Sequence, residues 1–266
     1  METQEELREK YNPEGSDLRR MQMRMLDMLK EVDRICKKYD IPYWLSGGTL
    51  LGGVRHEGFI PWDDDLDIEL MENDFQRFIE IAPSELSSNL VVQTHSTDEG
   101  YYFTYAKIRE LQSSIIEDGM SDKNFKYKGI YIDIFPMANT TPVLLKFSVY
   151  WHWYCVLKLS FQGTSNIILR KLCNLMYNLS SKIYLLFRYI DNRKKNQNIN
   201  YNYGCQFTLN CPPTVVFPLT RIKFENHLFS APNNPDLYLT KIYGDYLKLP
   251  DEQDRKTHIS YLTFNN

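Results

Sequence analysis

The chain has 266 residues, of which 43% are hydrophobic and 24% charged, a composition typical of a globular domain and not of collagen, a coiled coil or a disordered segment. Its 31 basic and 34 acidic residues give a net charge of −3, which argues against a general nucleic-acid-binding protein. Residues 141–200 depart from this balance, because nine basic residues and one acid give them +8 and leave −11 for the remainder. A basic segment of this kind suits an anionic surface or polymer, although lysines and arginines that only solvate helix faces would give the same count.

The five cysteines, at positions 36, 155, 173, 205 and 211, form no CxxC pair and no cluster with histidine at zinc spacing. We therefore expect buried, reduced thiols. The first 15 residues are polar and acidic, which predicts a loose leader and no signal peptide. Residues 143–161 are the most apolar stretch, but Lys146, His152 and Lys158 interrupt it, so a transmembrane helix is not expected. These features predict a cytoplasmic protein, with peripheral contact at the inner membrane face left open.

Apolar residues at three- and four-residue steps between Leu18 and Ile35 predict a first helix, which Ser16 or Asp17 caps and which ends near Tyr39. In chain order, the remaining patterns predict a strand at 43–45, a helix at 50–55, a strand from 65 to 70, a helix at 73–82, strands at 90–95, 101–109 and 129–135, helical periodicity over 143–195, a loop-rich stretch around 212–218 and a helix at 236–246. We therefore expect an α/β protein with a mixed β-sheet flanked by helices. It divides into a core at 1–140 and a mostly helical C-terminal elaboration at 141–266, packed on the core as one continuous unit.

The strongest local signal is the pair Asp65 and Asp67, which alternates with Leu66, Ile68 and Leu70. On a strand, residues two apart point to the same face, so both carboxylates project together while the apolar side chains enter the core. Two carboxylates held this close repel each other unless a cation or a proton lies between them. Oxygen ligands of this kind suit Mg²⁺ or Mn²⁺.

Asp133 has the same setting, since isoleucines occupy the alternate positions of the strand predicted at 129–135. If the two strands are neighbours, three carboxylates meet at one site. An exposed acidic turn is the competing interpretation, and for Asp63 and Asp64 it is as good as a functional one. A calcium-binding loop that starts at Asp63 fails, because it places Ile68 where the loop needs glycine.

A turn with the sequence Ser46-Gly47-Gly48-Thr49 lies between the predicted strand at 43–45 and the following helix. Glycines let backbone N–H groups approach phosphate oxygens, and a helix N-terminus favours negative charge. Gly-Gly turns are common, so the informative feature is the position of Gly48, seventeen residues before Asp65. A phosphate-binding turn, a D-x-D strand and a later carboxylate together describe a nucleotidyltransferase-type site, where metal ions neutralise the transferring phosphoryl group.

The 26-residue block from 43 to 68, YWLSGGTLLGGVRHEGFIPWDDDLDI, closely resembles the LicD family of phosphocholine transferases, which are relatives of fukutin and the fukutin-related protein. Shorter matches are KIR at 107–109, GIYIDIFP at 129–136 and YLTKIYGDY at 238–246. The resemblance extends from about residue 16 to residue 258 and is weakest at 140–215. Acceptor recognition therefore has the least support from the resemblance.

The resemblance implies a nucleotidyltransferase-like fold for the catalytic core and a phosphotransferase activity. The expected reaction moves a phosphocholine-like phospho-alcohol from a CDP-linked donor to a hydroxyl of a cell-surface glycan, free or lipid-linked, as in lipopolysaccharide biosynthesis, and releases CMP. Mg²⁺ or Mn²⁺ is the implied cofactor; no zinc is expected, since the zinc-binding insertion of the fukutin-related protein has no counterpart. By position, Asp65 and Asp67 match the family's metal pair, Asp133 its later carboxylate, as ligand or base, and Gly47 and Gly48 its glycine turn, where Thr49 follows.

Four further residues are candidates for binding the donor. Arg55 would neutralise the donor diphosphate, and the competing interpretation is a salt bridge to the aspartate run. His56, beside it, is explained equally well by a structural role. Lys107 and Arg109 alternate on one predicted strand, so both would face the phosphates unless that strand is a solvated edge.

Two other functions stay open. A nucleotidyltransferase in the strict sense would add a nucleoside monophosphate to a sugar phosphate or small molecule and release pyrophosphate. A non-catalytic glycan- or membrane-binding protein would work without metal, and the intact Asp65, Asp67 and Asp133 argue against it. In the basic segment, aromatic residues such as Trp151 and Trp153 lie among lysines, which suits a membrane surface if the rings are not core.

Overall fold

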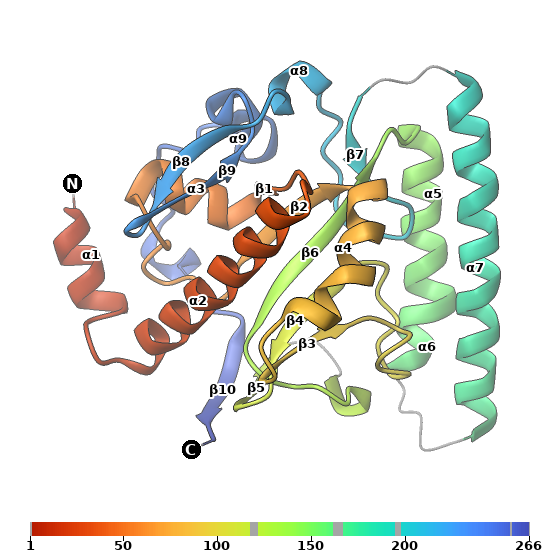
Figure 1. Ribbon diagram of the computed structural model, residues 1–266, viewed down its shortest axis with the longest axis horizontal. Helices are drawn as coiled ribbons and strands as arrows, with labels where there is room; N and C mark the ends of the chain where they lie inside the picture. The colour runs from red at the N-terminus through yellow and green to blue at the C-terminus, as the bar shows by residue number, and fades with distance from the viewer. Residues whose placement is uncertain (1, 118–121, 162–166, 195–197, 256, 266) are drawn as a thin grey trace.

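The computed structural model describes residues 2–117, 122–161, 167–194, 198–255 and 257–265, which form a mixed β-sheet flanked by helices (Figure 1). The helices are α1 (Gln4–Tyr11), α2 (Asp17–Lys38), α3 (Gly47–His56), α4 (Glu72–Glu85), η1 (Asp122–Asn124), α5 (Pro142–His152), η2 (Trp153–Leu157), α6 (Lys158–Ser160), α7 (Ile167–Lys194), α8 (Pro213–Val216), α9 (Pro235–Tyr243) and η3 (Glu252–Asp254). The strands are β1 (Trp44–Leu45), β2 (Asp67–Met71), β3 (Leu90–Gln93), β4 (Ala106–Glu110), β5 (Ser113–Glu117), β6 (Tyr131–Ala138), β7 (Asn200–Tyr201), β8 (Thr220–Phe224), β9 (His227–Ala231) and β10 (Ile259–Phe264). The expected α/β class with a mixed sheet is confirmed.

The central sheet has the strand order β1-β2-β6-β4-β3, and β7 pairs with the end of β6. Only β2 and β6 are parallel among these pairs; the other neighbours are antiparallel. The register places Asp67 opposite Asp133, and Lys107 of β4 opposite Asp133 on its other side. Because side chains alternate between the two faces of a sheet, these three polar residues share one face. The apolar residues between them, such as Ile68 and Ile134, are fully buried in the core.

Helix α2 lies with α4 across one face of the sheet (Figure 1). It forms as its pattern predicts: Ser16 accepts a hydrogen bond from the backbone N–H of Arg19 and caps the helix, and the apolar stripe from Met21 to Ile35 is buried. The loose leader expected at 1–15 is wrong. Residues 4–11 form α1, because Thr3 and Glu6 make a capping box whose two hydrogen bonds stabilise the first turn.

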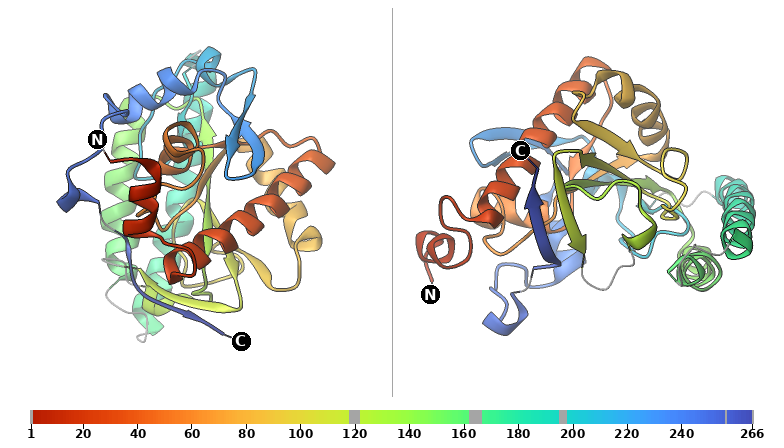
Figure 2. Two further views of the ribbon diagram at one scale, coloured as in Figure 1. Left: turned by 90° about the vertical axis from the view of Figure 1, so that its left-hand side faces the viewer. Right: turned by 90° about the horizontal axis from the view of Figure 1, so that it is seen from below.

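The segment after residue 140 contains both helices and strands. The helical periodicity over 143–195 corresponds to α5 and α7, which run side by side along one edge of the molecule (Figures 1 and 2). Helices make up most of the regular structure described in 141–266, and the strands β7, β8, β9 and β10 lie there as well. β8 and β9 form a hairpin, and β10 pairs with β5 of the core. β7 and β10 pair with strands from distant parts of the chain, whereas β8 and β9 pair with each other across a short turn.

Candidate active site

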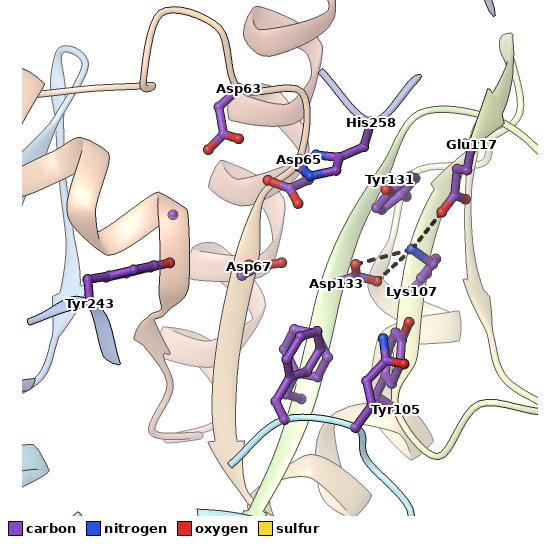
Figure 3. Close-up of a pocket in the computed structure, with 14 residues that line it drawn as sticks. Asp63, Asp65, Asp67, Tyr105, Lys107, Glu117, Tyr131, Asp133, Tyr243 and His258 are labelled. Carbon is purple, nitrogen blue, oxygen red and sulfur yellow. Dashed lines mark hydrogen bonds and ion pairs between the residues drawn. The ribbon is translucent and has the colours of Figure 1, made fainter. Parts of the chain in front are cut away.

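The three predicted metal ligands line one pocket of about 340 Å³, here called the aspartate pocket (Figure 3). Its lining residues are Gly48, Asp63, Asp65, Asp67, Tyr105, Lys107, Glu117, Tyr131, Asp133, Phe135, Gln206, Phe207, Tyr243 and His258. In Figure 3, Tyr243 reaches into the pocket from one side and Lys107 lies on the other, with the carboxylates of Asp65, Asp67 and Asp133 between them. The neighbouring strands expected from the sequence therefore bring three carboxylates together.

Backbone hydrogen bonds fix the position of the aspartates. The N–H of Asp133 donates to the carbonyl of Leu66 at 2.8 Å, which locks β6 to the start of β2. The N–H of Asp67 donates to Oγ1 of Thr49 at 2.8 Å, and the N–H of Ser46 donates to the carbonyl of Asp67 at 3.1 Å. Thr49, in the first turn of α3, thus holds that helix against the start of β2, a structural contact that sequence reasoning did not assign to it.

The two glycines of the turn make room for the carboxylates. Gly47 has φ of +49°, in the left-handed region that favours glycine. A Cβ atom on Gly47 would lie 2.9 Å from Oδ2 of Asp67, and one on Gly48 would lie 2.8 Å from Oδ2 of Asp63. The N-terminus of α3 therefore approaches the aspartates more closely than any side chain would allow. Its partial positive charge stabilises anions at this position.

A second buried carboxylate network supports this turn. Glu69 follows Asp67 by two residues on β2 and is fully buried. Its oxygens accept hydrogen bonds from Nε1 of Trp44 at 2.7 Å, from the hydroxyl of Ser46 at 2.5 Å and from the hydroxyl of Tyr238 at 2.5 Å. Glu69 thus connects β1, the N-cap of α3 and α9 beneath the pocket. We assign it a positioning role, which its place in an alternating strand did not reveal.

Burial and mutual repulsion raise the pKa values of the pocket carboxylates. The pKa of Asp67 is raised well above its ordinary value, first by burial and then by the charges of Asp65 and Asp133. Burial raises the pKa of Asp65 and also that of Asp63, which Asp65 raises further. Burial raises the pKa of Asp133 to about 6, although Lys107 acts in the opposite direction. Such a cluster is unfavourable in its fully ionised form unless a cation is bound.

The residues present fit a hard divalent cation. Oδ1 of Asp133 is buried and has no hydrogen-bond partner of acceptable geometry, although Nζ of Lys107 lies 2.9 Å away. Among the described residues, no donor hydrogen-bonds to the Asp67 carboxylate. Carboxylate oxygens that line a common pocket without hydrogen-bond donors of their own are the ligand set that Mg²⁺ or Mn²⁺ prefers. Asp65, Asp67 and Asp133 are the residues that would hold the ion.

Another acidic group, Asp63, Asp64 and His258, also has its ligand atoms within 4.8 Å of one another. Asp64 is already used: it accepts hydrogen bonds from the backbone N–H groups of His258 and Ile259, at 2.6 and 2.7 Å, and lies 3.0 Å from Nδ1 of His258. The hydrogen bond to Asp64 is the main cause that raises the pKa of His258 to about 9. These contacts attach β10 to the aspartate loop, and the same three side chains form a second group that could hold a cation.

Lys107 and Arg109 share a face of β4, as expected, but differ in their surroundings. Lys107 lines the aspartate pocket, 2.9 Å from Asp133, 3.7 Å from Glu117 and 3.3 Å above the ring of Tyr131. Arg109 does not line it. Its guanidinium donates to Gln93 at 2.8 Å, to the carbonyl of Gly129 at 2.8 Å and to Glu117 at 2.7 Å. Those buried contacts use the guanidinium, so we remove Arg109 from the candidate binding residues.

Arg55 and His56 are adjacent in the sequence but also have different surroundings. Arg55 lines an adjoining pocket of about 450 Å³ that shares Gly48, Asp63 and Tyr243 with the aspartate pocket. His56 is buried and lines neither pocket; its Nε2 accepts a hydrogen bond from Nε of Arg55 at 2.8 Å. Burial is the main cause that lowers its pKa to about 3, so its ring is neutral and orients Arg55. We therefore remove His56, too, from the candidate binding residues.

Several pocket residues had no local sequence signal. Glu117 lies on a strand that was not predicted, and Gln206 and Phe207 lie in the segment between β7 and α8. Tyr243 ends α9, within a short block that matches the LicD family. Only a comparison of whole family members, with these positions aligned, would have identified them.

Two glycines at a helix N-terminus, a D-x-D motif that leads into β2 and a carboxylate on the parallel neighbour β6 are the arrangement expected of a transferase with a nucleotidyltransferase-type site. Residues 40–161 match the LicD family, described as LicD/FKTN/FKRP, nucleotidyltransferase domain. Over 256 residues the chain is 30% identical to the lipopolysaccharide cholinephosphotransferase LicD of Haemophilus influenzae, covering 91% of this chain and 95% of that protein. The chain belongs to the LicD family.

Two more distant relatives share shorter segments. The chain is 40% identical over 48 residues to the ribitol 5-phosphate transferase FKRP of Homo sapiens, which covers 18% of this chain and 10% of that protein. It is 25% identical over 130 residues to the mannosyltransferase regulator 4 of Saccharomyces cerevisiae, covering 47% of this chain and 11% of that protein. The family resemblance derived from the sequence is confirmed, and the protein is an enzyme of the transferase class.

Proposed function

We propose that this enzyme transfers a phospho-alcohol of the phosphocholine class from a CDP-linked donor to a hydroxyl group of a glycan. The glycan oxygen forms a bond to the phosphorus that carries the alcohol, and the bond from that phosphorus to the oxygen of CMP breaks. CMP leaves, and the hydroxyl proton passes to a base. The choice of phosphocholine and of a lipopolysaccharide glycan rests on the name of the Haemophilus influenzae relative.

One observation carries this proposal: two half-buried carboxylates, Asp65 and Asp67, and the buried Asp133 line one pocket beside the N-terminus of α3, and all three have raised pKa values. A bound Mg²⁺ or Mn²⁺ would neutralise the donor diphosphate and orient the reacting oxygens. Asp65 and Asp67 would hold the ion. Asp133 either completes the set of ligands or accepts the proton of the acceptor hydroxyl. Lys107 contacts both oxygens of Asp133, at 2.9 and 3.1 Å, and so orients that carboxylate for either role.

We place the CMP part of the donor in the adjoining pocket. This pocket meets the aspartate pocket at Gly48, Asp63 and Tyr243, so one molecule extends through both. Arg55 and Lys248 line it and supply positive charge for a phosphate. The close backbone approach allowed by Gly47 and Gly48 serves the same phosphates.

The state of the cysteines supports a cytoplasmic location. All five are free, and four of them are buried. Free thiols persist in a reducing compartment, so we propose that the enzyme works in the cytoplasm.

Release of CMP tests the proposal. Purified enzyme with Mg²⁺ is incubated with CDP-choline, CDP-ribitol or CDP-glycerol and with lipopolysaccharide glycans, and the products are separated by chromatography. We expect CMP and a phosphorylated glycan with CDP-choline, and neither product with EDTA. Asp67→Asn serves as the inactive control with an unchanged side-chain shape.

A strict nucleotidyltransferase is the alternative, and a parallel reaction with a nucleoside triphosphate and a sugar phosphate tests it. That enzyme would release pyrophosphate from a nucleoside triphosphate and leave the CDP-alcohols intact. Formation of pyrophosphate, without CMP from any of the three donors, would overturn the proposed reaction while leaving the carboxylate site in place.

A further inference from the structure

The outer face of α7 carries an exposed apolar stripe. Its members are spaced by three, four or seven residues, with Lys182 in the longest gap, and are between 42% and 74% exposed: Ile168, Leu172, Leu175, Leu179, Leu186 and Tyr189. A stripe with this spacing normally faces the core of a protein. Here the core side of α7 is a different face, with Cys173, Ser180 and Tyr184 buried. The helix is therefore apolar on two faces, and one of them is uncovered.

Helix α5 and η2 extend this uncovered face. Their exposed side chains, between 40% and 76% accessible, are Val143, Phe147, Tyr150, Trp153 and Tyr154. The two helices are joined through aromatic contacts: the rings of Phe147 and Phe187 lie 6.1 Å apart, and Nε1 of Trp151 donates to the hydroxyl of Ser180 at 2.9 Å. Most of the exposed large hydrophobic side chains of the described residues lie on this pair, which forms one edge of the molecule (Figures 1 and 2).

The exposed charges of the same helices are all positive in the described part of 142–194. Lys146, Lys158, Lys171, Lys182 and Arg193 are exposed, and Arg170 is half-buried. Asp191, the one acid of this segment, is buried and accepts hydrogen bonds from Thr141 and Tyr203, while Arg188 pairs with Glu72. The aromatic residues that the sequence placed at a membrane surface are only partly confirmed, because Trp153 is exposed but Trp151 is half-buried.

We propose that the outer face of α5 and α7 docks on an anionic lipid bilayer, with α7 lying along the membrane plane. Apolar side chains enter the headgroup region, tyrosine and tryptophan lie at the interface, and the lysines meet lipid phosphates. A second copy of this chain fits less well, because a symmetric contact would bring two positive faces together without any acid between them. In the described part of the chain, none of the helices combines the length and apolarity needed to cross a bilayer.

The docking face is connected to the aspartate pocket. The segment after β7, which carries Gln206 and Phe207 into the pocket, rests on these helices: the N–H of Gly204 donates to the hydroxyl of Ser148 at 2.9 Å. Docking would therefore hold the pocket at a fixed place beside the bilayer.

Vesicle cosedimentation of the full chain tests the proposal. The vesicles contain phosphatidylcholine alone or with phosphatidylglycerol, at low and high salt. We expect binding only to the anionic vesicles, and loss of binding at high salt. Lys171→Glu with Lys182→Glu should lower the apparent affinity by about tenfold or more, since each basic residue near an anionic surface contributes on the order of 1 kcal/mol. Leu175→Gln with Leu179→Gln should also lower it.

A matched double variant controls for net charge. Lys37→Glu with Lys223→Glu changes the charge equally on α2 and β8, away from the face, and should bind anionic vesicles as the wild type does. Equal loss of binding in both charge variants, or no binding at low salt, would overturn the proposal. A dimer in analytical ultracentrifugation that dissociates on Leu175→Gln with Leu179→Gln would overturn it in favour of a second copy. None of these outcomes depends on the transfer reaction.

Discussion

Asp133→Asn tests whether repulsion between carboxylates strains the metal-free aspartate pocket. The variant keeps the shape of the side chain and removes its charge. Asp133 has a pKa of about 6 in the folded protein, against an ordinary value of 3.8. Because the folded state holds this proton more tightly than the unfolded state, ionisation of Asp133 penalises folding increasingly between about pH 4 and pH 6, and fully above that range. A difference of about two pKa units corresponds to about 3 kcal/mol.

A second effect of Asp133→Asn acts in the opposite direction. Removing one member of a buried ion pair usually costs about 3–5 kcal/mol, because its partner is left uncompensated. Lys107, however, keeps Glu117 at 3.7 Å and the ring of Tyr131 at 3.3 Å. The raised pKa of Asp133 already includes the attraction of Lys107, which acts to lower it. Repulsion and burial therefore outweigh the ion pair.

We expect Asp133→Asn to raise the free energy of unfolding in EDTA by about 3 kcal/mol at pH 8 and by less than about 1 kcal/mol at pH 4. Urea unfolding followed by tryptophan fluorescence measures both values, with the wild type at each pH as reference. Saturating Mg²⁺ should reverse the order, since the wild type gains more stability from the ion than the variant does. A variant that is less stable than the wild type at pH 8 in EDTA would refute the reasoning.

Three further predictions follow from the same site and from the core. Asp67→Asn should fold normally but lose transfer activity, because the neutral amide does not bind Mg²⁺ well, and full turnover in the CMP-release assay would contradict the metal assignment. CDP with Mg²⁺ should raise the melting temperature of the protein, and the shift should be smaller in EDTA. It should also be smaller in Gly48→Val, because a Cβ at this position would lie 2.8 Å from Oδ2 of Asp63. An equal shift in that variant would count against phosphate binding at the glycines. Burial lowers the pKa of His152 to about 4, so the folded state binds fewer protons than the unfolded state and stability falls as the pH drops below about 6.5. The wild type should lose about 2 kcal/mol more than His152→Gln between pH 7 and pH 5, and parallel pH profiles from urea unfolding would rule this out.

Local patterns in the sequence predict the centre of the site. Asp67 and Asp133 each alternate with buried aliphatic residues, so both the strands and the polar faces follow from a period of two. The environment of Arg109 could not be predicted in this way. Arg109 shares a face with Lys107, but its partners Gln93 and Glu117 come from β3 and β5. The sequence pattern did not predict the strand β5.

Contacts between distant segments account for the other differences. Tyr243 enters the pocket from α9, almost two hundred residues after the turn that it faces, and no local pattern encodes that approach. The capping box of α1 is different, because Thr3 and Glu6 stand at the spacing of a helix start in the sequence itself. We predicted a loose leader from the polar composition of residues 1–15, although the capping box could have been recognised in the sequence.

The attachment of β10 has a consequence for the order of synthesis. The pocket is built from residues between 48 and 258, and β10 reaches β5 only after the intervening segments have folded. While the ribosome is still adding the last strand, Asp64 lacks the backbone N–H groups of His258 and Ile259, and Glu117 lies on an unpaired strand edge. A nascent chain can therefore complete the core before it completes the site. The aspartate pocket is therefore complete only once β10 has paired with β5.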